Sequence, residues 1–153
     1  MRTSRSTMLA GVGLFLLTIG AATLSGATYL EIETDEDERG IREAVQYYFD
    51  GGTNADSTVL RKAFHPDARM LYVRDGTLNT VPIGEYITRV GSGKPAAPGT
   101  APQKRVVAID RFGTAATAKL EQRRPDGGVV VDFMSLLKVD GRWVIVNKIF
   151  DRQ

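Results

Sequence analysis

The sequence predicts an α+β domain in which helices cover one face of an antiparallel sheet. Two observations carry this prediction. Residues 39–68 have apolar side chains at helical spacing, and from residue 103 onward four long strand-like runs are separated by short turns. Helices come first in the chain and strands follow, an order typical of α+β folds rather than of alternating α/β folds.

The first helix is expected over residues 39–52. Ile41, Val45 and Tyr48 recur at helical spacing and form one face, and Gly51-Gly52 is a stop signal. The acidic run before it, at residues 31–38, places negative charge near the helix N-terminus, where the helix dipole favours it. Tyr48 therefore points into the core, where its hydroxyl needs a partner.

A second helix is expected over residues 54–68. Asp56 or Ser57 caps its start and Pro66 ends it. His65, the single histidine of the chain, then lies at the helix C-terminus, which favours a cation. Histidine is also the commonest general base, so a catalytic role for His65 stays open.

A strand, a turn and a third helix follow. Residues 68–74 form a strand that contains Tyr72, Asp75-Gly76 is a turn signal, and residues 77–81 are the hairpin partner. A short helix is expected over residues 83–90. Residues 91–102 are rich in Gly, Pro and Ala and are expected to form a surface loop.

The last two strands are joined at Asp140-Gly141, a strong two-residue hairpin signal. Counting back from this turn puts Val139 opposite Arg142 and predicts two faces. The first face comprises Asp132, Met134, Leu136 and Lys138 with Trp143, Ile145, Asn147 and Ile149. The other face comprises Val131, Phe133, Ser135 and Leu137 with Val144, Val146, Lys148 and Phe150.

Asp132 and Asn147 are polar residues on a face that is otherwise mostly apolar. Burying two such groups costs several kcal/mol unless they find partners. Either they satisfy each other in a closed core, or the face lines an apolar cavity with a few convergent polar groups, as small-molecule sites commonly do. On the second interpretation the candidate ligand-binding residues are Tyr48, Tyr72, Asp132, Met134, Trp143 and Asn147.

Composition excludes several kinds of site. The chain has no Cys and one His, which excludes disulfides, thiolate chemistry and multi-histidine metal centres. No Ca²⁺-loop spacing, phosphate-binding loop or dinucleotide fingerprint is present. We therefore expect neither a metal nor a cofactor.

Residues 1–27 have the pattern of a secretory signal peptide. Arg2 and Arg5 precede an apolar run at residues 9–22, and Ser25 and Ala27 are small residues at a cleavage site. The run is short for a membrane span, although an uncleaved anchor is the alternative. Cleavage after Ala27 leaves equal numbers of acidic and basic residues, which disfavours nucleic acid as a partner.

The expected organisation is a signal peptide at residues 1–27, an acidic lead-in at 28–37 and one domain at 38–153. The mature protein is expected to be secreted or periplasmic, without a stable membrane span.

Three stretches, "AFHPDARM", the Asp75-Gly76 turn and "VDFMSLLKVDGRWVIVNKIF", resemble the nuclear-transport-factor-2-like superfamily, and within it the lumazine-binding branch. The resemblance covers about residues 38–151. It implies a cone-shaped fold in which a curved antiparallel sheet wraps around helices, as in SnoaL-like and ketosteroid-isomerase-like proteins, and a dimer formed through the sheet. Because members include isomerases, cyclases, dehydratases and binders without catalysis, the fold alone does not give the function.

Isomerase-like members of the superfamily place a carboxylate on the first strand. The matching residues of this chain, 69–74, contain no acidic residue. We therefore expect an exported domain that binds a small apolar or aromatic molecule without clear catalytic residues. The alternative is a cofactor-independent isomerase, lyase or cyclase that uses Asp132 as base or orienting group, His65 as proton shuttle and Tyr48 as oxyanion donor. A third possibility is a protein-interaction module that uses the outer sheet face.

Overall fold

A computed structural model describes the backbone of residues 21–153 and the side chains of residues 36–153. The chain divides into two units, residues 1–33 and residues 34–153. In the first unit, residues 21–33 are helical. The second unit contains every strand of the described chain. Most of the predicted signal peptide, residues 1–20, lies outside the described residues.

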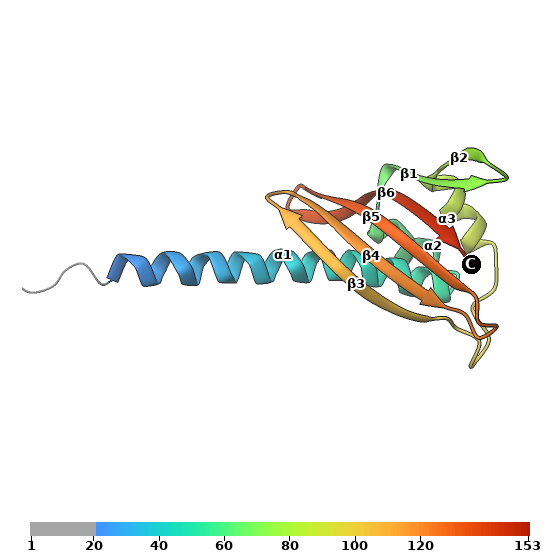
Figure 1. Ribbon diagram of the computed structural model, residues 1–153, viewed down its shortest axis with the longest axis horizontal. Helices are drawn as coiled ribbons and strands as arrows, with labels where there is room; N and C mark the ends of the chain where they lie inside the picture. Colours follow the sequence, from blue (N-terminus) through green and yellow to red (C-terminus); the bar gives the residue numbers. More distant parts are fainter. Residues whose placement is uncertain (1–20) are drawn as a thin grey trace, which may run out of the picture. The chain divides into compact units, whose positions relative to one another are not determined.

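The described residues form three helices and six strands (Figure 1). The helices are α1 (Ala21–Thr53), α2 (Ser57–Ala63) and α3 (Ile83–Gly91). The strands are β1 (Phe64–Arg74), β2 (Thr77–Pro82), β3 (Gln103–Phe112), β4 (Ala115–Arg123), β5 (Val129–Val139) and β6 (Arg142–Arg152). The predicted α+β class is confirmed.

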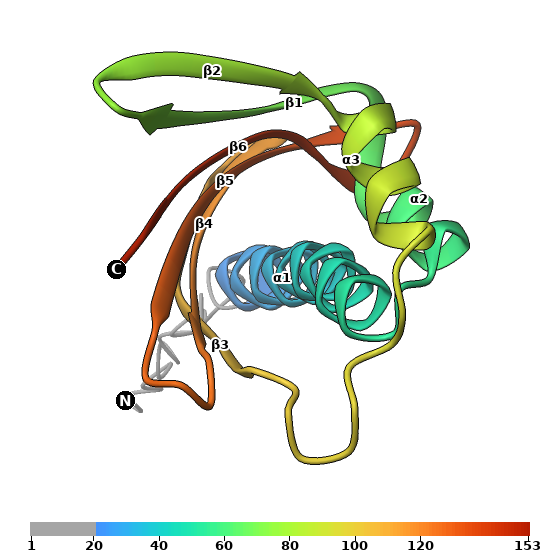
Figure 2. The ribbon, with the colours of Figure 1, turned by 90° about the vertical axis from the view of Figure 1, so that its right-hand side faces the viewer.

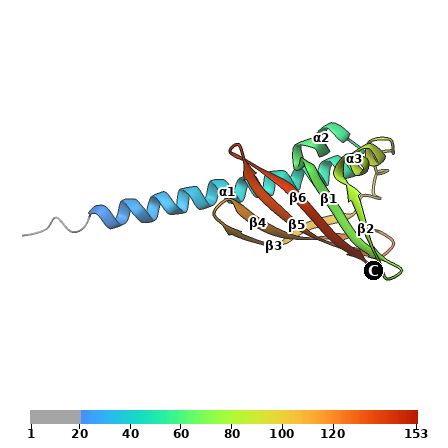
Figure 3. The same ribbon diagram turned by 90° about the horizontal axis from the view of Figure 1, so that it is seen from above.

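One sheet contains all six strands in the order β2-β1-β6-β5-β4-β3. Neighbouring strands are antiparallel except β1 and β6, which run parallel side by side (Figure 3). The prediction of a purely antiparallel sheet was therefore wrong at this one pair. Tight hairpins impose antiparallel pairing, whereas β1 and β6 are far apart in the chain and no such turn constrains them.

The sheet curves around the part of α1 that belongs to the second unit, and α2 and α3 pack at one end (Figure 2). Ile41, Val45 and Tyr48 of α1 are each at most 4% exposed and face the sheet. They pack with Leu60 of α2, Ile83 and Ile87 of α3, and Leu120, Met134, Leu136 and Ile145 of the sheet. The helical face predicted from spacing is thus the face that makes the core.

Two helix boundaries differ from the prediction. α1 includes the acidic residues expected to form a separate lead-in, and no break separates them from the helix. α2 ends at Ala63, and Phe64 already has extended backbone angles. His65 precedes Pro66, which disfavours helical angles, and Phe64 is buried, so the chain enters β1 two residues before the proline.

The register of the last hairpin also differs. The pairs nearest the turn, Val139 with Arg142 and Leu136 with Ile145, agree with the prediction. A bulge at Val146 then shifts the ladder by one residue, so that Asp132 lies opposite Phe150 rather than Ile149. Because side chains alternate, the shift moves every later residue of β6 to the other face of the sheet.

The segment between β1 and β3 agrees with the prediction. Asp75 and Gly76 both have positive φ, the geometry that this kind of two-residue turn requires. α3 follows β2 directly, and residues 92–102 form a loop without strands or long helices. Within the described part of the chain, no helix is long and apolar enough to span a membrane.

Candidate functional site

Four side chains from α1, β4, β5 and β6 form a buried hydrogen-bonded cluster, called here the floor cluster: Tyr48, Gln122, Asp132 and Lys148. The Tyr48 hydroxyl donates to Asp132 Oδ2 at 2.9 Å, and Gln122 Nε2 donates to the same oxygen at 2.7 Å. Lys148 Nζ donates to the Tyr48 oxygen at 2.6 Å. Asp132 is 0% exposed and Lys148 4% exposed, so these two charged side chains are shielded from bulk water.

Asp132 and Lys148 also form a buried ion pair. Lys148 Nζ lies 2.9 Å from Asp132 Oδ1. That oxygen accepts no well-directed hydrogen bond, so the contact is mainly ionic. Burying two opposite charges together avoids an isolated buried charge, which would cost far more than the pair.

Aromatic rings surround the Lys148 ammonium. Its nitrogen lies 4.8 Å from the ring centroid of Tyr48, 4.7 Å from that of Phe150 and 5.8 Å from that of Tyr86. These distances are typical of cation–π contacts, which strengthen when the cation is desolvated. Burial, and then the negative charge of Asp132, raise the pKa of Tyr48 well above its ordinary value, so its hydroxyl stays protonated.

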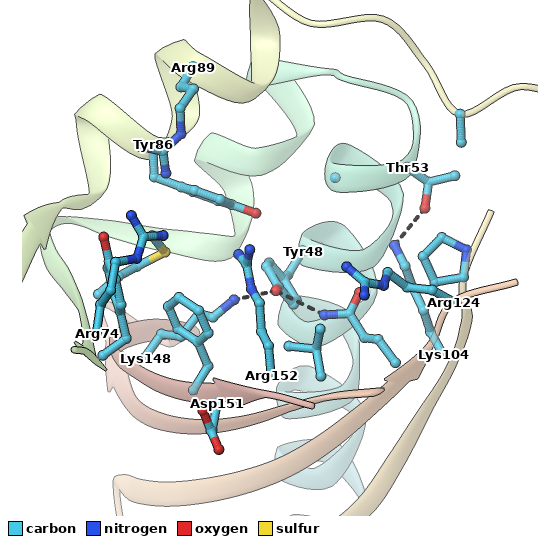
Figure 4. Close-up of a pocket in the computed structure, with 18 of the residues that line it drawn as sticks. Tyr48, Thr53, Arg74, Tyr86, Arg89, Lys104, Arg124, Lys148, Asp151 and Arg152 are labelled. Carbon is cyan, nitrogen blue, oxygen red and sulfur yellow. Dashed lines mark hydrogen bonds between the residues drawn. The ribbon is translucent and has the colours of Figure 1, made fainter. Parts of the chain in front are cut away.

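A cavity of ≈ 760 Å³ opens above this cluster (Figure 4). Tyr48, Met70 and Lys148 are buried at its base, and Tyr72, Tyr86, Lys104, Gln122 and Phe150 are half-buried along its sides. The remaining lining residues near the opening include Arg74, Arg89, Lys94, Arg124, Asp151 and Arg152. The cavity is thus open to solvent on one side and closed by a polar, buried base.

The cavity lining is strongly cationic. Seven of its residues are basic, namely Arg74, Arg89, Lys94, Lys104, Arg124, Lys148 and Arg152, and one is acidic, Asp151. The Asp151 carboxylate points away from the cavity (Figure 4). At the base of the cavity, the negative charge of Asp132 neutralises Lys148. The lining differs from the apolar one that the sequence predicted.

Lys104 ties the cavity wall to the end of α1. Its ammonium donates to the Phe49 carbonyl oxygen and to Thr53 Oγ1 in the last helical turn. This bond satisfies a carbonyl at the helix terminus, where a cation is favoured. Burial nevertheless lowers the pKa of Lys104 to about 8, against the opposing charges of Asp50 and Asp132.

The structure brings together three of the sequence-predicted site residues. Tyr48 and Asp132 are in direct contact, and Tyr72 lies on the cavity wall. Met134 is 1% exposed in the core beside them. Trp143 lies elsewhere, on a smaller hollow of ≈ 240 Å³ beside the start of β6.

Asn147 and His65 do not join this site. Because of the bulge at Val146, Asn147 faces away from the cavity, and Lys148 takes the place predicted for it. His65 lies in β1, where its Nδ1 accepts a hydrogen bond from the Asp67 backbone N–H at 3.2 Å. The neighbour of His65, Phe64, pairs with Ile145, whereas Asp132 pairs with Phe150. Ile145 and Phe150 are five residues apart on β6, or roughly 15 Å, so His65 and Asp132 do not meet.

Sequence reasoning missed most of the cationic lining. Arg74, Arg124 and Arg152 each follow or end a strand, and Arg89 lies in the last turn of α3. Each of these positions is ordinary for a solvated charge, so no local signal marks them. The available signal was the shared place of Arg74, Arg124 and Arg152 at strand ends, and it becomes informative only once the strand order is known.

Among the side chains that the structure describes, no group of acidic or histidine residues is suited to hold a metal ion.

Comparison with known proteins identifies the family. Residues 36–151 match the family model described as "Putative lumazine-binding". No curated protein matches the chain by sequence.

Similar solved structures support the same family assignment. A nuclear-transport-factor-2-like protein of unknown function from Shewanella baltica OS155 is 32% identical, with a TM-score of 0.69 over 77% of this chain and 94% of that one. Another from Methylobacillus flagellatus KT is also 32% identical, with a TM-score of 0.66 over 77% and 93% of the two chains. A protein from Novosphingobium aromaticivorans, 17% identical, shares the fold with a TM-score of 0.64 over 87% and 90%. The chain therefore belongs to the "Putative lumazine-binding" family of nuclear-transport-factor-2-like proteins, with their α+β cone fold.

Proposed function

We propose that this domain binds a small, negatively charged molecule in the cavity above the floor cluster. One observation carries the proposal: seven basic residues line the cavity, and the carboxylate of its single acidic residue points away from it. Like charges brought together repel one another, and an anion entering the cavity relieves this repulsion. The walls of low dielectric strengthen the attraction.

Aromatic side chains also line the cavity, in agreement with the aromatic ligand expected from the sequence. Tyr72, Tyr86 and Phe150 line the cavity and supply aromatic surface for a flat ligand. The family description names lumazine, a flat heteroaromatic compound, and such a ring suits these walls. The apolar ligand expected from sequence is replaced by one that combines a ring with negative charge.

Binding is favoured over catalysis by the state of the floor cluster. The proposed acid–base pair of Asp132 and His65 requires the two side chains to converge, and they lie on distant parts of the sheet. Asp132 is already engaged by Tyr48, Gln122 and Lys148. A carboxylate held in this way stabilises the base of the cavity and is poorly placed to accept a proton from a ligand.

The first test is binding of 8-anilinonaphthalene-1-sulfonate, a fluorescent aromatic anion. We expect saturable binding that weakens as salt is raised, because the attraction is electrostatic. Arg152→Met should weaken it by about tenfold. Arg61→Met, on the exposed surface of α2, is the matched control and should leave it unchanged. Equal affinity at low and high salt would reject an anionic ligand.

We also propose that the domain is exported, with cleavage after Ala27. The basic N-terminal residues, the apolar run and the small residues before the cleavage site support this proposal. The intact mass of the protein after expression with its own N-terminus tests it. A chain that begins at Thr28 and fractionates outside the cytoplasm is expected, and a chain that keeps residues 1–27 would reject cleavage.

Homodimerisation through the outer sheet face is proposed for a separate reason. Phe133, Leu137 and Ile149 are 47%, 41% and 46% exposed on β5 and β6, and no described helix lies on the outer face of β5 (Figure 2). Adjacent exposed apolar residues commonly mark interfaces. Sedimentation of the protein should show a dimer, and Phe133→Glu should give a monomer with an intact cavity. A monomeric wild-type protein would reject the proposal. The prediction that Lys148 shares a sheet face with Phe133 was wrong, because Lys148 is buried on the cavity side whereas Phe133 is exposed.

A further inference from the structure

We propose that the ligand is an aromatic phosphate monoester, with its ring between the aromatic walls and its phosphate at three arginines around the opening. This inference rests on the proposed function and deepens it by naming the ligand class and its orientation. The three arginines come from β1, α3 and β6, and are Arg74, Arg89 and Arg152.

Each of these arginines lies beside an aromatic residue of the wall. The distances from guanidinium carbon to ring centroid are 5.5 Å for Arg74 and Tyr72, 5.9 Å for Arg89 and Tyr86, and 5.0 Å for Arg152 and Phe150. A guanidinium that contacts a ring still has N–H groups free along its edge. These can form the paired hydrogen bonds that suit phosphate oxygens.

The charge of these three arginines is not neutralised by the protein. Within residues 36–153, none of them forms an ion pair, whereas Arg124 pairs with Asp126 at 3.2 Å. Lys148 is neutralised by Asp132 at the base of the cavity. The uncompensated positive charge is therefore concentrated at the opening, and a phosphate dianion there balances two of the three charges.

The space below the opening suits a ring rather than a second charge. The ring centroids of Tyr72 and Phe150 lie 5.0 Å apart with an interplanar angle of 35°, so these two rings pack against each other and form one aromatic wall of the cavity. The Tyr86 ring extends from α3 towards Tyr48 (Figure 4). Burial and the nearby Tyr48 raise the pKa of Tyr86, so its hydroxyl stays neutral. A flat apolar group thus meets ring faces and neutral hydroxyls before it reaches the buried ion pair.

The test compares three probes by calorimetry: 1-naphthyl phosphate, 1-naphthol and inorganic phosphate, at about pH 7.5, where the monoester is mostly dianionic. We expect 1-naphthyl phosphate to bind at least about tenfold more tightly than either of the others. Arg74→Met, Arg89→Met and Arg152→Met should each weaken it by about tenfold and leave 1-naphthol unchanged. Arg61→Met is the control and should have no effect. Arg74, Arg89 and Arg152 are all exposed, so their replacement does not disturb the core.

The outcomes separate this inference from the proposed function. If inorganic phosphate binds as tightly as 1-naphthyl phosphate, the ring site is rejected and the anionic cavity stands. If the three variants leave 1-naphthyl phosphate binding unchanged while Lys104→Met abolishes it, the anion binds deep in the cavity and the orientation is rejected. If 1-naphthol binds as tightly as its phosphate, both this inference and the proposed function fail.

Discussion

Two buried aspartates connect α1 with the last hairpin, and they are built differently. Asp37 lies near the β5–β6 turn, and Asp132 lies further along the sheet, where it contacts Tyr48 of α1. Asp37 and Tyr48 are eleven residues apart on the helix, or roughly 16 Å. The two carboxylates therefore fasten the same helix at two separate places.

Asp37 carries one negative charge and contacts two cations, Lys138 and Arg111. Lys138 Nζ donates to it at 2.7 Å, Trp143 Nε1 donates at 3.0 Å, and Arg111 lies 3.0 Å from its second oxygen. Burial by itself raises the pKa of Asp37, but hydrogen bonds from Lys138 and Trp143 and the charges of Lys138 and Arg111 outweigh it and lower the pKa. Both carboxylate oxygens are engaged, so nothing is left for a ligand.

Asp132 meets one cation and two neutral groups, and it lies beneath an open, cationic cavity. Its Oδ1 is held only by the ionic contact with Lys148. The two aspartates therefore serve different purposes. Asp37, with both carboxylate oxygens bonded, fixes α1 to the last hairpin. Asp132 neutralises only Lys148, so the other basic residues of the cavity keep their positive charge for a ligand.

The largest effect should come from removing the buried carboxylate. Asp132→Ala leaves Lys148 charged and unpaired at 4% exposure, and we expect a loss of about 3–5 kcal/mol in the free energy of unfolding, measured in urea. Asp151→Asn, exposed on the same sheet, is the control. The double variant Asp132→Leu with Lys148→Met should recover much of the loss, because no unpaired charge remains. A loss below about 1 kcal/mol for Asp132→Ala would show that Lys148 escapes to water.

Asp37→Asn should cost less, about 1–3 kcal/mol. The side chains of Lys138 and Arg111 are 33% and 21% exposed, so water can solvate them when the carboxylate is gone. Binding of 1-naphthyl phosphate should not change, since Asp37 lies outside the main cavity. Reduced binding would mean that the two sites are coupled through α1.

The same variant has a predicted pH signature. The folded-state pKa of Asp37 lies below its ordinary value of 3.8, so its contribution is present above that pH and is lost as pH falls through the lower folded pKa. Below about pH 3.8, the free energy of unfolding of the wild-type protein should therefore fall more steeply with decreasing pH than that of Asp37→Asn. Identical slopes would contradict the predicted role of the charge.

Gly40→Ala tests the packing around Asp37. A Cβ there would lie 2.8 Å from Trp143 Cδ1, which would move the indole that donates to Asp37. Overpacking outweighs the gain in helix propensity, so we expect a net loss of about 1 kcal/mol. Gly52→Ala is the matched control on α1, because no atom lies within 4 Å of its Cβ, and it should stabilise by about 0.5–1 kcal/mol. Thermal unfolding of both variants gives the comparison.

The smallest effect concerns Lys104. Since its pKa is lowered to about 8, the residue loses its charge as pH rises through that value, and affinity for 1-naphthyl phosphate should fall about two- to fivefold. Between about pH 8 and its ordinary value of 10.5 the unfolded chain binds more protons, so this lysine makes stability rise with pH. Lys104→Met should remove both dependences. A pH-independent affinity in the wild-type protein would contradict this role.

Local patterns in the sequence determined much of the fold. The helical stripe of Ile41, Val45 and Tyr48, the turn residues Asp75-Gly76 and Asp140-Gly141, and the order of helices before strands each predicted what the structure contains. These features depend on neighbours within a few residues, which is why they can be read from the chain. The inward position of Tyr48 and Asp132 followed from the same periodicities.

Only the tertiary structure decided the site. The bulge at Val146 has no local sequence signal, yet it exchanges Asn147 for Lys148 at the base of the cavity. The cationic opening depends on β1, α3 and β6 meeting at one edge, and β1 pairs with β6 across most of the chain. A shift of one residue in register inverts which side chains face inward, and charges far apart in sequence converge only after folding, so neither could be predicted from local composition.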